Sequence, residues 1–191
     1  MKVIAFTGNY GSQAGTLESY LMADSSILYS GRPFFVPDFA QRFVAVPTIV
    51  VRTGRLGKCI SPKFAHRYWD ALTAAFRVEA QQGDQPSLMA LDRAFDGAAI
   101  VGDWVEAGSV ADALHEPVEV MIDDIVVSRH CLADMVHPLA DVLAGVSTRC
   151  SIKMGDLLLT GDTGAQHTLA PGQRLTATVG GRQVLDVKVK L

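Results

Sequence analysis

Charged side chains around position 77 have the residue types and spacing to hold a charged ligand. Arg77 and Arg93 each carry a guanidinium, a planar fork of N–H donors that suits a carboxylate, a phosphate or a sulfate. Glu79 stands two residues after Arg77, so on a strand both side chains would share one face. The spacing therefore predicts an ion pair between Arg77 and Glu79, with Arg93 as a second cation whose direction the sequence does not give.

The three cysteines, Cys59, Cys131 and Cys150, are odd in number, widely spaced and never in a C-x-x-C pair. This pattern predicts reduced, isolated thiols rather than a disulfide framework or a zinc site. A cysteine nucleophile would need a base, and His130 directly precedes Cys131. Adjacent residues on a strand point to opposite faces, so a buried or incidental thiol is the favoured interpretation.

Composition is that of an ordinary globular chain. Its 191 residues are 49% hydrophobic and 19% charged, with a net charge of −3, which fits one domain over residues 1–191. The absence of a run of Lys or Arg argues against a nucleic-acid-binding protein. The first ten residues carry too short an apolar run for a signal peptide, and no run approaches a membrane span. We expect a cytoplasmic protein with no membrane or nucleic-acid partner.

Apolar patterning predicts strands with a few helices. Residues 2–8 predict a first strand, followed by a helix or ordered loop over 13–23. The β-branched segment 42–54 predicts a strand, in which Pro47 belongs at the start, at an edge or at a bulge. Segment 61–70 opens like a helix, with Ser61 and Pro62 at its entry.

Two hairpins and a last helix follow. Residues 118–128 and 176–191 predict hairpins, the second more clearly because Gly180 and Gly181 permit the positive φ of a tight turn. Residues 137–147 predict the last helix. Segment 71–78 is ambiguous, because propensity alone would continue a helix through it.

Several segments resemble the fumarylacetoacetate hydrolase family, most closely its short bacterial members. They are RPFFVPDF, VVRTGRLGKCI, FAHRYWDALT, RAFDGAAIVGDWV, KMGDLLLTGDTG and LAPGQRLTATVGGRQVLDVKVKL. The resemblance implies a mixed α/β, mostly β fold: a β roll of several small mixed sheets with a few flanking helices, usually assembled as a homodimer. It also implies a strand at 71–78, and an N-terminal strand and lid region over 1–31 before a core over 32–191.

The family's metal ligands have no counterpart at the matching positions. The resemblance implies a Glu-x-Glu pair and a third carboxylate around a divalent ion, and these positions fall on Val46, Thr48 and Arg77. Magnesium needs oxygen ligands, usually charged ones, and arginine would repel it. We therefore predict no metal cofactor. Asp70 and Glu79 are the nearby acids that could replace the ligands, but pairing of Glu79 with Arg77 is the simpler account.

The family's other catalytic positions are also changed. The lid histidine and glutamate that move a proton match Gln13 and Thr16, and glutamine cannot take up a proton near neutral pH. The substrate-holding lysine matches Arg93, which keeps the charge but not the shape. The threonines that hold a substrate carboxylate match Thr160 and Asp162, and an aspartate would repel an anion unless an arginine neutralises it.

The leading hypothesis is a family member that has lost metal-dependent C–C bond chemistry and acts as a non-catalytic binding or partner protein. The alternative is an active hydrolase, decarboxylase or 2-hydroxydienoate isomerase acting on acylpyruvate-type substrates, with magnesium held by ligands not yet placed. A third possibility is a structural subunit that pairs with an active relative.

The direction of Arg77 separates two hypotheses about the former metal region. In one, a small anion held by Arg77, Arg93 and Thr160, or an internal acid such as Asp162 or Glu79, occupies that region. In the other, apolar side chains such as Val46 and Phe76 fill it, and Arg77 turns outward to solvent.

Overall fold

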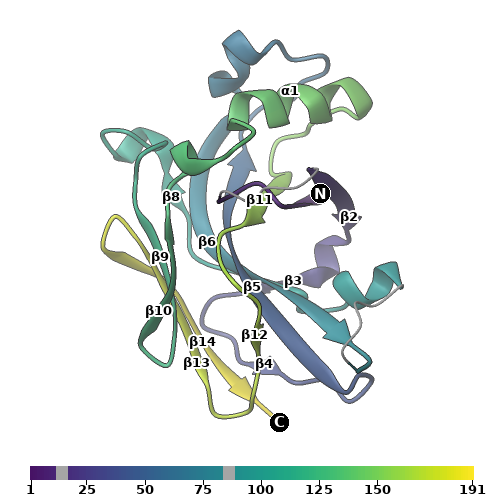
Figure 1. Cartoon of the computed structure of the whole chain (residues 1–191). Coiled ribbons are helices and arrows are strands. Elements are labelled where there is room, and N and C mark those ends of the chain that lie inside the picture. The colour runs from purple at the N-terminus through teal and green to yellow at the C-terminus, as the bar shows by residue number, and fades with distance from the viewer. Residues whose placement is uncertain (12–16, 84–88) are drawn as a thin grey trace.

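Two curled, mixed sheets make up most of the described part of the chain, and helix α1 lies across one end of it (Figure 1). The computed structural model describes residues 1–11, 17–83 and 89–191. The predicted fold class, mixed α/β and mostly β with few helices, is confirmed.

In the described part of the chain, nine strands form the larger sheet, in the order β2-β1-β11-β5-β6-β7-β3, with β12 and β8 pairing beside β5 and β6. Parallel pairs join β1 to β11 and β3 to β7, so the sheet is mixed. Its strands are β1 Val3–Thr7, β2 Glu18–Met22, β3 Ile27–Tyr29, β5 Arg42–Thr53, β6 Trp69–Gln81, β7 Ala99–Val101, β8 Val105–Glu106, β11 Leu157–Asp162 and β12 His167–Thr168.

The smaller sheet has the order β10-β9-β13-β14-β4. Both predicted hairpins lie in it and are confirmed, with positive φ at Asp123 and Asp124 in one turn and at Gly180 and Gly181 in the other. Its strands are β4 Phe34–Phe35, β9 Val118–Ile122, β10 Ile125–His130, β13 Arg174–Val179 and β14 Arg182–Lys190.

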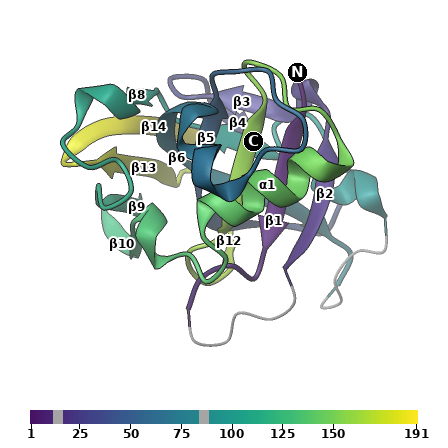
Figure 2. The same ribbon diagram turned by 90° about the horizontal axis from the view of Figure 1, so that it is seen from above.

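Helix α1, Leu139–Arg149, confirms the predicted last helix and lies over the ends of β1 and β2 when the molecule is seen from above (Figure 2). Leu139, Val142, Leu143 and Val146 repeat at helical spacing and are buried. Short 3-10 turns are η1 Asp24–Ser26, η2 Pro62–Arg67, η3 Ala90–Arg93, η4 Ala107–Ser109 and η5 Leu132–Asp134. Among the described residues, no helix is long and apolar enough to cross a membrane.

Strands β5 and β6 are the centre of the larger sheet. They pair antiparallel from Arg42 opposite Gln81 to Thr53 opposite Trp69. The smaller sheet contacts one face of β6, where the main core lies, and a second apolar cluster covers the other face. Because both faces are buried, residues 71–76 of β6 are apolar apart from one threonine and do not alternate with polar residues. This explains why propensity favoured a helix at 71–78, where the strand implied by the resemblance is confirmed.

Pro47 lies within β5 and not at its start, between Thr48, where the pairing with β11 ends, and Ala45, where the pairing with β12 begins. Its carbonyl accepts a hydrogen bond from the Thr163 amide, 2.9 Å away, so its nitrogen faces the same side. On that side the register shifts between Leu159 and Asp162, and β12 takes over the pairing at Ala45. The missing N–H of proline therefore leaves no ladder bond unmade, because Pro47 lies at an interruption of the ladder next to the bulge and not at a strand start.

Two predictions near the N-terminus and at 61–70 need correction. The helix or ordered loop expected over 13–23 is wrong for its second part, because Glu18–Met22 is strand β2, paired with β1; residues 13–16 lie outside the described residues. Most side chains of β2 are exposed, so this edge strand does not show the apolar pattern that predicts a strand. Pro62 does open a helix, but only a 3-10 turn that Ser61 does not cap with its side chain.

Asp156 joins the N-terminus to the start of β11. Its side chain is 1% exposed and accepts hydrogen bonds from the Lys2 amide at 2.7 Å and the Lys153 amide at 2.8 Å, besides an ion pair with the Lys2 ammonium. Burial alone would raise the pKa of this carboxyl, but the bonds from Lys2 and Lys153 outweigh it and lower the pKa.

We predict that Asp156→Asn lowers the free energy of unfolding by about 1–3 kcal/mol at neutral pH, because buried donors lose a charged acceptor. A depressed carboxyl pKa contributes stability above the unfolded-state pKa that is lost as pH falls through the folded-state pKa. The difference from wild type should therefore shrink below about pH 4 in urea unfolding curves. Asp103→Asn, at an exposed carboxylate, is the control; equal losses in both variants would contradict the role of Asp156.

Candidate functional site

The positions that the resemblance assigns to metal ligands come together on one face of the larger sheet. Val46 of β5 lies directly opposite Arg77 of β6, and Thr48 lies opposite Asp162 of β11. Residues opposite each other across an antiparallel pair share a face, and so do residues two apart. This face is the one away from the main core, covered by the second apolar cluster.

Arg77 turns inward over this face. Its side chain is only 2% exposed, and its Nη2 donates to Asp162 Oδ1 at 2.8 Å. Its Nη1 pairs with Glu79 and lies 3.4 Å from the Tyr20 hydroxyl. The predicted Arg77–Glu79 pair is confirmed, and the hypothesis that Arg77 turns out to bulk water is wrong. Phe76, its neighbour in β6, packs in the main core on the opposite face.

The guanidinium of Arg77 reaches its second acid by crossing over β5. Asp162 is on β11, two strands from β6, a separation of about 10 Å at the usual strand spacing. Val46 and Thr48 lie beneath that path, and both are short side chains. Longer acidic side chains at these two positions would fill the space that the guanidinium takes.

A second arginine completes the group. Arg93 of η3 lies with its Nε 3.3 Å from Glu79 Oε1, and its guanidinium is 5.8 Å from the centre of the Tyr20 ring. Its side chain is 30% exposed, whereas that of Glu79, between the two arginines, is 8% exposed. We call Tyr20, Arg77, Glu79, Arg93 and Asp162 the Arg77 cluster. Two cations and two acids make it formally neutral.

The cluster keeps Arg77 charged. Burial lowers the pKa of Arg77, but electrostatic interactions with Tyr20, Asp162 and Glu79 outweigh burial, and the net result is a raised pKa. Burial also raises the pKa of Tyr20 against the opposing effect of Arg77, so the phenol keeps its proton near neutral pH. In the described structure the Arg77 Nε is buried without a hydrogen-bond partner.

Thr160 faces a different set of groups. Its hydroxyl donates to the Ile49 carbonyl at 2.9 Å and lies 2.8 Å from the Tyr10 hydroxyl, a buried contact of the main core. The bulge between Leu159 and Asp162 lets Asp162 join the Arg77 cluster while Thr160 points elsewhere. The structure thus brings together Arg77, Arg93 and Asp162, with Thr160 engaged on the main-core side.

The segment after β1 is fixed to β11. Asn9 is fully buried and bonds the Thr160 carbonyl at 2.9 Å and the His137 amide at 2.8 Å. Gly161 has φ +133°, and a Cβ there would approach the Asn9 Cβ to 2.6 Å, so this contact requires glycine. Gln13 and Thr16, which match the family's proton-transfer residues, lie outside the described residues.

The donors at the family's metal position do not fit a divalent ion. Val46 has no lone pair, Thr48 offers a neutral hydroxyl, and Glu79 and Asp162 already bind the Arg77 guanidinium. A dication placed there would meet a buried positive charge. Across the part of the chain that the structure describes, no three His, Cys, Asp or Glu side chains gather as a metal site.

The cysteines give no second candidate. Cys59, Cys131 and Cys150 are free thiols, as predicted. Burial raises the pKa of Cys131 above its usual value, which disfavours the thiolate. Asp134 accepts from the Cys131 amide at 2.8 Å and is the partner of the His130 ring, 3.3 Å away.

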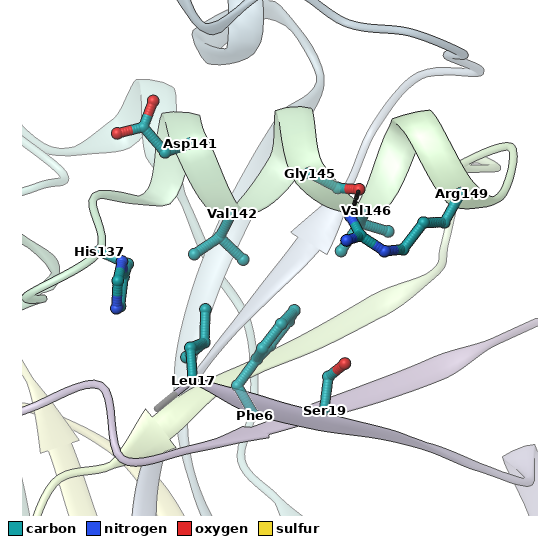
Figure 3. Close-up of a pocket in the computed structure, with 9 residues that line it drawn as sticks. All are labelled: Phe6, Leu17, Ser19, His137, Asp141, Val142, Gly145, Val146 and Arg149. Carbon is teal, nitrogen blue, oxygen red and sulfur yellow. Dashed lines mark hydrogen bonds between the residues drawn. The ribbon is translucent and has the colours of Figure 1, made fainter. Parts of the chain in front are cut away.

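A cavity of about 240 Å³ lies beneath α1, between the helix and β1 and β2 (Figure 3). Phe6 and Leu17 face Val142 and Val146 across it, while the Arg149 guanidinium folds back to the Gly145 carbonyl, 2.9 Å away. Phe6 belongs to the main core, so the larger sheet separates this cavity from the Arg77 cluster. Its residues come from distant segments, and sequence reasoning missed it.

Comparison with known proteins decides the family. Residues 9–190 match the family model for the fumarylacetoacetate (FAA) hydrolase C-terminal domain. The chain belongs to the fumarylacetoacetate hydrolase family. No curated protein matches its sequence.

Solved structures share the fold of this family member at low sequence identity. Fumarylpyruvate hydrolase from Pseudomonas aeruginosa, in complex with Mn²⁺ and pyruvate, is 16% identical with a TM-score of 0.86, covering 100% of this chain and 90% of its own. 5-Carboxymethyl-2-hydroxymuconate delta-isomerase from Mycobacterium smegmatis is 21% identical, with a TM-score of 0.86 and coverage of 99% and 78%. 2-Hydroxyhepta-2,4-diene-1,7-dioate isomerase from Mycobacterium marinum is also 21% identical, with a TM-score of 0.84 and coverage of 99% and 74%.

We predict that the two acids of the Arg77 cluster differ in their contribution to stability. Glu79→Gln should cost roughly 3–5 kcal/mol, because it leaves a buried guanidinium with one acid fewer. Asp162→Asn should cost less, about 1 kcal/mol, because Asp162 is 28% exposed and water can replace it. Denaturant unfolding of both variants measures the difference. Equal losses would mean that Glu79 is not the anchor of the cluster.

Proposed function

We propose that this family member does not carry out metal-dependent C–C bond chemistry and acts as a non-catalytic binding or partner protein. One observation carries the proposal: at the position matching the family's third metal ligand, Arg77 is buried opposite Val46 and held by Glu79 and Asp162. The family's metal chemistry needs a dication at that place, and a buried guanidinium there supports the exclusion of such an ion.

Charge supports the proposal further. For a metal to reach Glu79 and Asp162, Arg77 would have to leave both acids, and a separated buried charge is costly. The matched proton-transfer positions, Gln13 and Thr16, offer no general base. Neither the electrophile nor the base of the family's reaction is therefore supplied by the matching residues.

Within this proposal, a small anion is the ligand class that the site favours. Arg93 is the more exposed cation of the cluster, and its guanidinium suits a carboxylate. The Arg77 guanidinium is satisfied by internal acids, so a bound anion would rely mainly on Arg93. We therefore propose that the protein binds a small anion. We also propose that it forms a homodimer and is cytoplasmic.

The second candidate is an active hydrolase, decarboxylase or isomerase for acylpyruvate-type substrates. Family membership favours this candidate. So do the structural neighbours, which are a fumarylpyruvate hydrolase in complex with Mn²⁺ and pyruvate and two isomerases. It requires Arg77 to move away from Glu79 and Asp162 so that the acids become available. A metal-binding measurement on the wild-type protein therefore separates the two candidates.

We predict that Mg²⁺ and Mn²⁺ leave the melting temperature of the wild-type protein unchanged and that acylpyruvates are not turned over in their presence. A bound ion would stabilise the fold by roughly 2.7 kcal/mol at a hundredfold excess over its dissociation constant. Differential scanning fluorimetry and a substrate panel measure both. Metal-dependent stabilisation that Glu79→Gln abolishes, or metal-dependent turnover, would instead support the second candidate, an active enzyme.

A triple variant tests the assignment of the ligand positions. Val46→Glu, Thr48→Glu and Arg77→Asp together should create magnesium binding, measurable by calorimetry, and should destabilise the metal-free form by placing like charges together. Acylpyruvate cleavage should not return, because Gln13 and Thr16 still cannot move the proton. Robust cleavage by this variant would show that the lid residues are misassigned.

A further inference from the structure

The cavity beneath α1 has an apolar middle and a polar side chain at each end (Figure 3). Phe6 lies on the strand side of the cavity, and Val142 and Val146 face it from the helix. Each of these three residues is 9% exposed or less. The His137 ring stands at one end and the Arg149 guanidinium at the other. An apolar space with a cation at one end suits a molecule that has an apolar body and one anionic group.

Gly145 leaves room for the Arg149 guanidinium beside the helix. The Nη1 of Arg149 donates to the Gly145 carbonyl at 2.9 Å, which holds the guanidinium at this end of the cavity. A Cβ at position 145 would have only that Nη1 within 4 Å, at 3.9 Å, so the space around it is open. Among the described residues, Arg149 forms no ion pair with an acid, and its other N–H donors can bind an anion.

Asp141 does not oppose an anion at the Arg149 end. Its carboxylate lies on the side of α1 that faces away from Phe6 and Leu17 (Figure 3). Positions 141 and 149 are separated by about 12 Å of helix at 1.5 Å per residue. That distance exceeds the Debye length of about 8 Å at physiological ionic strength, so the repulsion from Asp141 is largely screened.

The volume of the cavity limits the size of the ligand. The cavity holds about 240 Å³. An apolar protein cavity of about 150 Å³ binds benzene, which has six carbon atoms, so this one accommodates roughly nine or ten non-hydrogen atoms. A linear monocarboxylate of about seven or eight carbons has that size.

We propose that the cavity beneath α1 binds a medium-chain monocarboxylate of about six to eight carbons. Its hydrocarbon chain lies against Phe6, Val142 and Val146, and its carboxylate accepts hydrogen bonds from the Arg149 guanidinium. This site goes beyond the proposed function, because the larger sheet separates it from the Arg77 cluster.

The experiment titrates the wild-type protein with octanoate by isothermal titration calorimetry and follows ¹³C-labelled octanoate by nuclear magnetic resonance. We expect one site with a dissociation constant on the order of 0.1–1 mM. Shorter carboxylates should bind more weakly, by about fourfold for each CH₂ removed. Octylammonium has the same chain and the opposite charge, so it should not bind.

Two variants test the residues of the site. Arg149→Gln should weaken octanoate binding roughly tenfold or more, because a charge-assisted hydrogen bond is lost. Arg182→Gln, at an exposed arginine of the smaller sheet, is the matched control and should bind as wild type does. Gly145→Leu keeps Arg149 and fills the open space beside it, so it should abolish binding. Leucine favours helix over glycine, so this second variant should keep α1 folded.

Three results would overturn the proposal. They are a wild-type protein without saturable octanoate binding, octylammonium binding as tight as that of octanoate, and equal weakening by Arg149→Gln and Arg182→Gln. Octanoate binding that survives either Arg149→Gln or Gly145→Leu would also overturn it, and would point instead to the anion site proposed at Arg93.

Discussion

The antiparallel pairing of β5 with β6 is the constraint on which the rest of the structure depends. Along this ladder each residue's face follows from its position, so Val46, Thr48, Arg77 and Glu79 are held on one side while Phe76 enters the main core on the other. A register shift of one residue would exchange these faces and bury the arginine among apolar side chains. The bulge of β11 between Leu159 and Asp162 then allows Thr160 and Asp162 to contact different partners.

Burial of Arg77 in turn determines which neighbours the second face can accept. A guanidinium that is 2% exposed needs acids close by, and it receives them from its own strand and from β11. Tyr20 of the edge strand β2 contacts Arg77, and Arg93 of η3 pairs with Glu79. Four separate segments therefore depend on one charge, which is why single changes here are expected to act on stability before they act on any ligand.

The sequence predicted local features better than distant ones. The glycine pair of the C-terminal hairpin, the apolar spacing of α1 and the two-residue step from Arg77 to Glu79 are local signals, and each appears in the structure. Strand β2 was missed because it lies at an edge with exposed side chains. The contact from Arg77 to Asp162 was raised as one alternative only through the family resemblance, because it spans 85 positions and depends on the order β11-β5-β6, which no local pattern contains. The cavity beneath α1 was hidden for the same reason.

A metal ion and a guanidinium can each balance buried acids, but they differ in what they leave open. A catalytic ion keeps coordination positions for water or substrate, and through them it polarises the reacting oxygen. The Arg77 guanidinium offers N–H donors in a plane, and both of its outer nitrogens are bound to acids of the protein itself. It can hold β6 and β11 together as an ion would, yet it has no vacant position from which to activate a ligand. Under the proposed function, the guanidinium would join the strands by charge without offering a site for catalysis.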